Sequence, residues 1–310
     1  MALAGHLWTV ASRFWPVPEP PEARPWRTQV IDPQVGEVPL TGLLRAEPGS
    51  TDLLIFVHGI GGCAEASYAK KVAGMAFAMG LSCLRINLRG SDRASNDFYH
   101  AGLSSDLAQV VASPDLAGFE RIYCLGYSLG GHLALRYACE TPDPRVQGVA
   151  AVCSPLDLAP AAAVIDRPAS WPYRRYVLRN LLTIYRSVAE RRPVPLPVEE
   201  AERFTLIRHW DDLVVSPRWG FIGASDYHAR ASVAPLLPHL AVPALLVAVD
   251  DDPMVPGEVV RPVVARRFEG LDVRWVDRGG HVGFPRDLDL GEDAPLGIEG
   301  QALGWLLRAG

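Results

Sequence analysis

The amino-acid sequence predicts an α/β protein in which helices cover both faces of a mostly parallel central sheet. One observation is a series of short apolar runs that alternate with segments of helical spacing, which is typical of a doubly wound sheet. A second is that this rhythm stops between residues 157 and 238, where we expect a helical cap inserted across the carboxyl edge of the sheet. A third is that residues able to do chemistry follow the ends of several apolar runs.

Length and composition fit one large domain with an insertion. The chain has 310 residues, of which 49% are hydrophobic and 21% charged, so it can bury a large core. Its net charge of -5 provides no basic face, and we therefore expect no nucleic-acid partner. The five cysteines include no CxxC pair and are expected to be reduced and buried: Cys63, Cys83, Cys124, Cys139 and Cys153.

Residues 1–27 are rich in proline and tryptophan and are expected to form an extended arm that lies on the domain. The apolar stretch from Met1 to Val10 has no basic region before it and is interrupted by His6, unlike a secretory signal. No window has the 18 or so uninterrupted apolar residues of a membrane span. We therefore expect a soluble cytoplasmic protein with no transmembrane segment.

The core is expected to comprise residues 28–156 and 239–310. Alternating residues between Thr28 and Arg45 predict a hairpin at the edge of the sheet. The continuous apolar run from Leu53 to Val57 is typical of a strand buried on both faces of a parallel sheet. Further strands are expected at 81–87, 122–125, 149–152, 243–249 and 271–276, of which 122–125 and 149–152 are expected to be buried, with helices at 68–79 and from Ser104 to Val111.

A glycine-rich loop, His58-Gly59-Ile60-Gly61-Gly62, follows the first buried strand. Gly59-x-Gly61-x-x-Ala64 resembles a relaxed dinucleotide-binding pattern, but the next strand ends without the acid that would bind the ribose. The alternative is an oxyanion hole, in which the backbone N–H of Ile60 joins that of Leu129. Both functions require glycine, so the loop alone does not decide. We favour the oxyanion hole and expect no bound cofactor.

A Gly126-x-Ser128-x-Gly130 pattern lies between an apolar run and a helix-like segment. A serine in a sharp strand-to-helix turn adopts strained backbone angles, and the flanking glycines make room for it. The pattern also occurs by chance in ordinary turns. It indicates a nucleophile only if an acid and then a histidine follow at later strand ends.

Three acids, Asp250, Asp251 and Asp252, follow the strand at 243–249. One of them could orient a catalytic histidine, or all three could form a solvated turn. Pro253 restricts the residue before it to extended angles, which favours Asp252 as the rigidly held acid. Asp251 remains the alternative if the strand is one residue shorter.

His281 lies between glycines after the last strand, and so follows both the serine and the acids. The order Ser128, Asp252, His281 is that of the α/β-hydrolases. The remaining histidines in or near the core and cap include His58, His132, His209 and His228. None has the spacing of a metal-binding motif, and we expect no metal.

The insertion contains a segment from Trp171 to Glu190 with apolar residues at helical spacing and arginines between them. Such a helix could contact a lipid surface or anionic headgroups. A solvated polar face is the explanation that we favour.

Taken together, these motifs resemble the YheT-like branch of the α/β-hydrolases over roughly residues 14–285. The resemblance includes His58-Gly59-x-x-Gly62, Asn87-x-Arg89-Gly90, Tyr99-His100-x-Gly102, the serine turn, Asp251-Asp252-Pro253, the loop from Gly279 to Phe284, and the insertion's Trp210-Asp211-Asp212, Gly220-Phe221, Asp226-Tyr227 and Ala231-Ser232. It implies the α/β-hydrolase fold, a triad of Ser128, Asp252 and His281, and hydrolysis of carboxylic esters, possibly lipid-like. Trp210 and His132 depart from the branch, which prefers phenylalanine and asparagine there. Both are expected near the pocket and bear on substrate choice.

The sequence therefore predicts acyl transfer from a small-molecule or lipid ester through an acyl-enzyme that water releases. An acyltransferase would use an alcohol or thiol instead of water. A third alternative is a catalytically silent binding protein on the same fold. The sequence leaves oligomeric state open.

Overall fold

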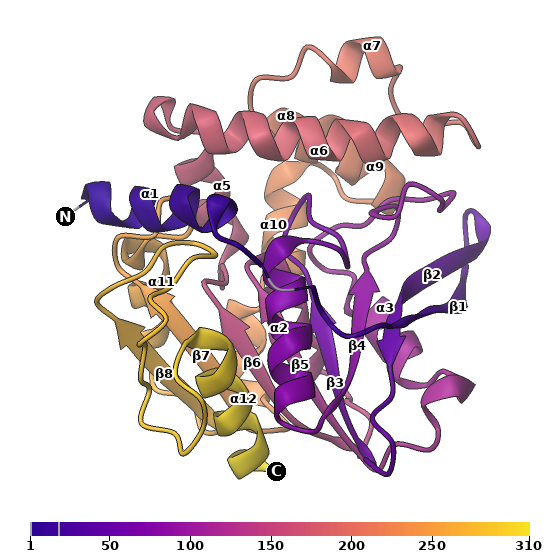
Figure 1. Cartoon of the computed structure of the whole chain (residues 1–310). Coiled ribbons are helices and arrows are strands. Elements are labelled where there is room, and N and C mark those ends of the chain that lie inside the picture. The colour runs from indigo at the N-terminus through magenta and orange to yellow at the C-terminus, as the bar shows by residue number, and fades with distance from the viewer. Residues whose placement is uncertain (1, 18) are drawn as a thin grey trace.

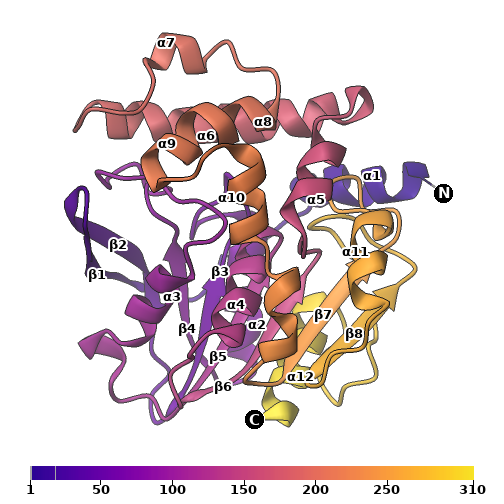
Figure 2. The ribbon, with the colours of Figure 1, turned by 180° about the vertical axis from the view of Figure 1, so that it is seen from behind.

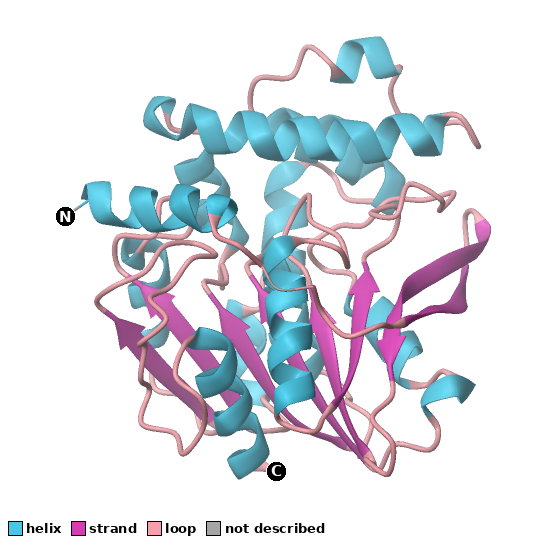
Figure 3. Ribbon diagram, viewed as in Figure 1, coloured by secondary structure: helices cyan, strands magenta, loops and turns pink. Residues whose placement is uncertain are grey.

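The computed structural model describes residues 2–17 and 19–310, and its centre is a sheet of eight strands in the order β1-β2-β4-β3-β5-β6-β7-β8 (Figures 1 and 3). The strands are β1 (Arg24–Asp32), β2 (Gly36–Arg45), β3 (Asp52–Val57), β4 (Ser82–Asn87), β5 (Arg121–Tyr127), β6 (Val146–Val152), β7 (Ala244–Val249) and β8 (Leu271–Val276). From β4 to β8 all neighbouring strands are parallel. The predicted mostly parallel α/β sheet is confirmed.

The edge of the sheet is the expected hairpin. β1 and β2 pair antiparallel, with Val30 opposite Val38, and β2 then pairs antiparallel with β4. Along β2 the exposed fraction alternates between buried and half-buried residues, as in a strand with one face on the core. The period of two in the sequence therefore predicted this element correctly.

Helices cover both faces of the sheet because successive side chains of each central strand point to opposite sides. In β3, Leu54 and Phe56 pack with α2 (Ser67–Ala78) and α12 (Ile298–Ala309). Leu53 and Ile55 belong to the core on the other face, which is covered by α3 (Ser104–Val111), α4 (Leu129–Cys139) and α11 (Gly257–Val264), seen in Figure 2. Both faces of the central strands are buried, which explains their continuous apolar runs.

Residues 157–238 contain no strand. Their helices are α5 (Leu158–Ile165), α6 (Trp171–Ala189), α7 (Val198–Ala201), α8 (Ile207–Trp210), α9 (Ser216–Trp219) and α10 (Ala224–Ala231), with a π-helical turn η4 (Asp211–Val215) between α8 and α9. Figure 1 shows α6 to α9 above the carboxyl ends of the strands. A final 3₁₀ segment, η5 (Ala234–His239), packs on α4 in the body of the protein. The division of the chain into core and cap at 157 and 238 stays a prediction.

A buried ion cluster joins the cap to the core. Arg218 of α9 contacts Asp97 at 2.7 Å and Asp32 at 2.9 Å, and both acids also contact Arg89 at 2.9 Å. Arg89 in turn makes two bonds to Asp106 of α3, at 2.6 and 2.7 Å. These five residues are at most 6% exposed, so water screens their charges little.

The N-terminal segment differs from the extended arm expected for residues 1–27. Residues Ala2–Ala11 form a helix, α1, followed by a 3₁₀ turn, η1 (Ser12–Phe14). The stretch ALAGHLWTVA contains no proline and several good helix formers, whereas the prolines that suggested an extended chain begin at Pro16. α1 lies beside the cap and above the ends of β7 and β8 (Figure 1).

No helix in residues 2–17 and 19–310 is long and apolar enough to span a membrane. All five cysteines are free, four of them are buried, and Cys63 is half-buried. Burial raises the pKa of the Cys83 and Cys124 thiols to about 12, so these side chains behave as small hydrophobes.

Candidate active site

Ser128 lies at the turn between β5 and α4 with φ of 55° and ψ of -123°, a backbone conformation that costs energy for a residue other than glycine. The turn is tight because a Cβ at Gly126 would lie 2.3 Å from the backbone of Gly130, and a Cβ at Gly130 would lie 2.1 Å from the carbonyl oxygen of Val57. The N–H of Ser128 donates to the carbonyl of Val152 at 2.8 Å. The sequence pattern therefore does form a strained turn that holds one serine in a single position.

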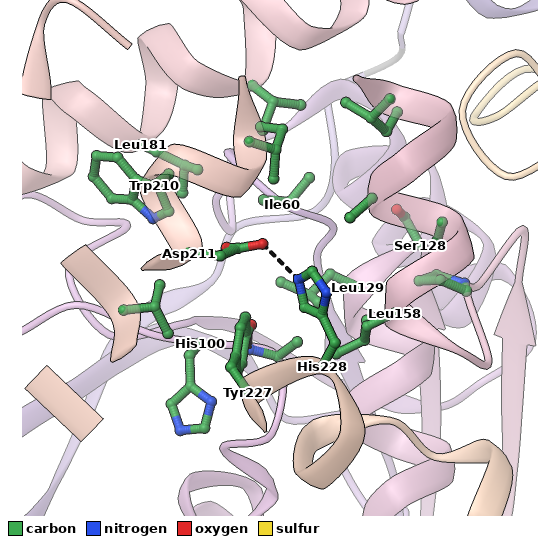
Figure 4. Close-up of a pocket in the computed structure, with 18 of the residues that line it drawn as sticks. Ile60, His100, Ser128, Leu129, Leu158, Leu181, Trp210, Asp211, Tyr227 and His228 are labelled. Carbon is green, nitrogen blue, oxygen red and sulfur yellow. Dashed lines mark hydrogen bonds and ion pairs between the residues drawn. The ribbon is translucent and has the colours of Figure 1, made fainter. Parts of the chain in front are cut away.

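A pocket of about 120 Å³ opens beside Ser128, between the sheet edge and the cap (Figure 4). Ile60 and Leu129 from the core and Leu158, Leu181 and Trp210 from the cap contribute to its apolar wall. Trp210, which departs from the family pattern, thus lines the pocket as expected. An apolar wall next to a single nucleophile suits the hydrocarbon part of a substrate.

Ile60 and Leu129 carry the backbone N–H groups predicted to form the oxyanion hole. Neither N–H donates to any acceptor within the described parts of the chain, and both residues line the pocket with Ser128. Leu129 begins α4, where the first N–H groups have no partner within the helix. Two unsatisfied donors beside a nucleophile can stabilise a developing oxyanion.

The neighbouring amides of the glycine-rich loop are already paired. Gly59 donates to the hydroxyl of Tyr68 at 3.1 Å, Gly61 to that of Tyr99 at 2.7 Å, and Ala64 to the side chain of Asn87 at 2.8 Å. A phosphate cradle would need several free N–H groups. The geometry of the loop therefore favours an oxyanion hole over dinucleotide binding, the alternative that the sequence left open.

His58 links the glycine-rich loop to the residue that follows β4, a role that the sequence did not predict. Its Nδ1 lies 2.8 Å from the carbonyl oxygen of Gly59, and its Nε2 accepts from the N–H of Leu88 at 3.1 Å. Burial lowers the pKa of His58 to about 4, so the ring is neutral at pH 7. A neutral ring that donates through Nδ1 and accepts through Nε2 satisfies both contacts.

Asp252 is the acid that the structure pairs with His281. The Nδ1 atom of His281 lies 2.8 Å from Oδ2 and 3.1 Å from Oδ1 of Asp252. Oδ1 also accepts from the N–H groups of Met254 and Val255, at 2.8 and 3.1 Å. Burial opposes ionisation of Asp252, but the contact with His281 and the two N–H bonds outweigh it and lower the pKa of the carboxyl. The carboxylate is therefore rigid and ionised.

The other two acids of this loop face elsewhere. Asp250 forms an exposed ion pair with Arg261 of α11. Asp251 is half-buried and makes no hydrogen bond to His281. In this geometry only Asp252 holds the imidazole.

His281 is held on its backbone side by α1. The N–H of His281 donates to Thr9 Oγ1 at 2.9 Å, and Thr9 Oγ1 donates to the carbonyl of Gly5 at 2.8 Å. No hydrogen bond joins His281 to Ser128 Oγ in the described residues. The structure thus brings Asp252 and His281 together and places Ser128 at the same sheet edge. The contact with Thr9 has no signal in the sequence, because 272 residues separate the partners.

His100 and His228 line the pocket, and His132 contacts Pro155 of its wall. His132 places Nδ1 2.8 Å from the carbonyl of Pro155 and Nε2 2.9 Å from that of Ala231, and so ties α4 to the end of α10. His228 of α10 lines the pocket and pairs with Asp211. Neither His132 nor His228 has metal-ligand spacing in the sequence, so the spacing alone did not mark them as functional. Within residues 2–17 and 19–310, no three His, Cys, Asp or Glu side chains gather as a metal site would require.

The chain is similar to a protein family, to several known proteins and to solved structures. A family model described as "alpha/beta hydrolase fold" matches residues 52–184. The chain is 29% identical over 238 residues to "Putative esterase YheT" of Escherichia coli, covering 74% of this chain and 70% of that protein. It is 25% identical over 252 residues to a monoacylglycerol lipase of Saccharomyces cerevisiae, covering 76% of this chain and 55% of that protein.

Among solved structures, the chain resembles the Pyrococcus furiosus esterase Pf2001, with a TM-score of 0.54, 17% identity, and coverage of 84% of this chain and 85% of that one. It also resembles mouse alpha/beta hydrolase domain-containing protein 10, with a TM-score of 0.51, 17% identity, and coverage of 83% and 90%. At these identities the likeness shows the fold alone.

Proposed function

Because this chain has the α/β-hydrolase fold and resembles the YheT-like branch of that superfamily, we propose that it is a serine hydrolase that cleaves carboxylic esters. Relatives named esterase, monoacylglycerol lipase and phospholipase support hydrolase activity in general. We further propose that the substrates are esters and that Ser128, Asp252 and His281 act on them.

The observation that carries the proposal is the position of Ser128 on the wall of an apolar pocket, in a strained turn and beside two free backbone N–H groups. A merely structural serine would not need this backbone conformation, which costs about 1–3 kcal/mol. The arrangement suits attack on a carbonyl carbon whose oxygen becomes negative.

In the proposed mechanism, His281 Nε2 takes the proton of Ser128 as Oγ attacks the ester carbonyl. Asp252 holds His281 in the tautomer with the proton on Nδ1 and stabilises the imidazolium that forms. The N–H groups of Ile60 and Leu129 bind the oxyanion. His281 then protonates the leaving alcohol, and water activated by the same histidine releases the acyl group. Hydrogen bonds to a catalytic serine are often long without substrate and shorten when it binds.

The pocket wall supports a substrate with an acyl or alkyl chain. Leucines and Trp210 of the cap would cover such a chain, while Ser128 reacts at its polar end. Lipid-like esters and short or medium acyl esters fit this description. Contact of α6 with a membrane surface during their uptake stays a prediction.

The test uses a fluorophosphonate probe and a panel of p-nitrophenyl esters. We expect mass spectrometry to find the probe on Ser128, and Ser128→Ala to abolish labelling and lower kcat by about 10⁴-fold or more. Product that appears only with added alcohol or thiol acceptors would indicate an acyltransferase. If Ser128 is not labelled and no ester is turned over, the protein would be a catalytically silent binding protein.

A further inference from the structure

A second aspartate–histidine pair lies in the pocket, apart from Asp252 and His281. His228 Nε2 and Asp211 Oδ2 are 2.7 Å apart, and the two residues are 4% and 7% exposed. Asp211 begins the π-helical turn η4, a conformation often found at functional sites. The proposed ester hydrolysis uses neither residue.

The pair presents one unused polar atom to the pocket. His228 Nε2 is taken by Asp211, whereas Nδ1 has no hydrogen-bond partner within the described chain. Both residues line the same wall as Ser128, and Figure 4 shows the His228 ring with its bond to Asp211 among apolar side chains. Because His228 lies on the pocket wall and no hydrogen bond within the described chain occupies its Nδ1, a ligand in the pocket can pair with this atom.

The end of α10 is held by hydrogen bonds to α4 and to the start of α5. The carbonyl of Ala231, at the end of α10, lies 2.9 Å from His132 Nε2, and the backbone N–H of His132 donates to the backbone carbonyl of Ser128 at 3.0 Å. Ser232 at the end of the same helix accepts from the N–H of Leu158 at 2.9 Å. His228 therefore lies one helical turn from a residue that is held against α4, the helix that begins directly after Ser128. Such rigid support suits recognition of a substrate group.

We propose that His228 Nδ1, oriented by Asp211, recognises a hydroxyl group on the part of the ester substrate that enters the pocket. A hydroxyl both donates and accepts, so it can pair with Nδ1 in either tautomer of the ring. A plain hydrocarbon chain would leave Nδ1 unpaired. The inference rests on the proposed hydrolase and adds a substrate class to it, namely hydroxylated esters.

The experiment compares esters matched in chain length, with and without a hydroxyl. One series has hydroxyls at successive positions of the acyl chain with p-nitrophenol as leaving group. The other compares a monoester of 1,3-propanediol with the propyl ester, so the two series separate a hydroxyl on the acyl side from one on the alcohol side. We expect at least one hydroxylated ester to have a kcat/KM about tenfold or more above its plain partner.

Two isosteric variants test His228 itself. His228→Gln retains a nitrogen that reaches Asp211 but loses the polar atom at the Nδ1 position, and should bring the hydroxylated-to-plain ratio of kcat/KM to within about twofold of one. His228→Asn places an amide near the Nδ1 position and should restore most of the ratio. His209→Gln, the same change at an exposed histidine of α8, should keep the wild-type ratio. Melting temperatures establish that each variant is folded.

Binding to Ser128→Ala separates the two hypotheses, because this variant holds esters without cleaving them. Tighter binding of a hydroxylated ester of either series than of its plain partner, lost with His228→Gln, would support the inference even if no ester were hydrolysed. Equal Kd values for the two esters, with normal labelling of Ser128 in the wild type, would overturn the inference and leave the hydrolase standing.

Discussion

Asp252 has four hydrogen-bonding contacts on one carboxylate: two with His281 and one each with the amides of Met254 and Val255. The N–H groups of Met254 and Val255 belong to the same turn as Asp252, so they orient its carboxylate independently of the contact with His281. A rigid acceptor of this kind keeps the proton of His281 on Nδ1 and leaves Nε2 free for the serine.

The first prediction compares neighbouring acids. Asp252→Asn preserves shape but favours the wrong tautomer of His281, so kcat should fall by up to about 10⁴-fold. Asp251→Asn, which has no bond to His281, should change kcat by less than about threefold. Steady-state kinetics on one p-nitrophenyl ester decide the matter, and the reverse ranking would assign the acid to Asp251.

The second prediction concerns Thr9. Thr9→Val keeps the shape of the side chain but leaves the N–H of His281 without its acceptor. Misplacement of the histidine should lower kcat about tenfold with little change in KM. Val10→Thr, a change at the exposed neighbour, is the control and should have the wild-type kcat. A normal kcat in Thr9→Val would show that α1 only packs against the loop.

At the scale of elements, α6 has two different faces. Val177 and Leu181 are buried and line the pocket, whereas Leu178 and Leu182 line a separate groove on the outer side of the cap. Arg175 and Arg179 lie exposed at this outer groove. The inner face therefore contacts substrate in our proposal, and the outer face does not.

The third prediction uses these faces. Leu181→Ala enlarges the pocket and should change the ratio of kcat/KM for long esters over acetate by about three- to tenfold. Leu182→Ala is the same substitution one residue away on the outer side, and should change the ratio less than twofold. The ratio is measured across acyl lengths from two to twelve carbons. If it changes equally in both variants, α6 acts on the pocket only through the packing of the cap.

The fourth prediction concerns the buried ion cluster that joins the cap to the core. Arg218→Met removes a buried cation and leaves Asp97 and Asp32 with less compensation, which should lower the free energy of unfolding by about 3–5 kcal/mol. Arg230→Met, at an exposed ion pair of α10, should change it by less than about 0.5 kcal/mol. Chemical denaturation measures both, and a small effect of Arg218→Met would show that the cap does not depend on the cluster.

The fifth prediction is that stability falls on acidification from about pH 6.5 to about pH 4. Burial lowers the pKa of His58 to about 4 and that of His100 to about 3. On acidification, the folded state therefore binds these protons at a lower pH than the unfolded state does. Stability therefore rises with pH across this window, and His58 alone contributes on the order of 3 kcal/mol.

His100→Phe tests the fifth prediction because it retains an aromatic ring beside Trp219 and Phe221 but cannot titrate. Its free energy of unfolding should depend less steeply on pH between 6.5 and 4 than that of the wild type. Parallel curves for the two proteins would exclude His100 as a source of the dependence.

The sheet, the order of the candidate site residues and the strained serine turn could all be predicted from the sequence. These features are local: a buried parallel strand is a continuous apolar run, and the turn at Ser128 needs glycines only two residues away on each side. Pro253 likewise favoured Asp252 through the geometry of adjacent residues. The prediction of an extended arm was wrong at α1 for an equally local reason: the prolines begin at Pro16, after the helix has ended.

Tertiary structure decided what depends on distant parts of the chain. His281 meets Thr9, Arg218 meets Asp97 across 121 residues, and His228 meets Asp211 through the turn of η4. None of these pairs has a characteristic spacing, because each forms only when separate elements pack against one another. A buried hydrogen bond or ion pair forms where tertiary packing places two side chains within reach of each other. The pattern of neighbouring residues in the sequence does not show which distant side chains will meet.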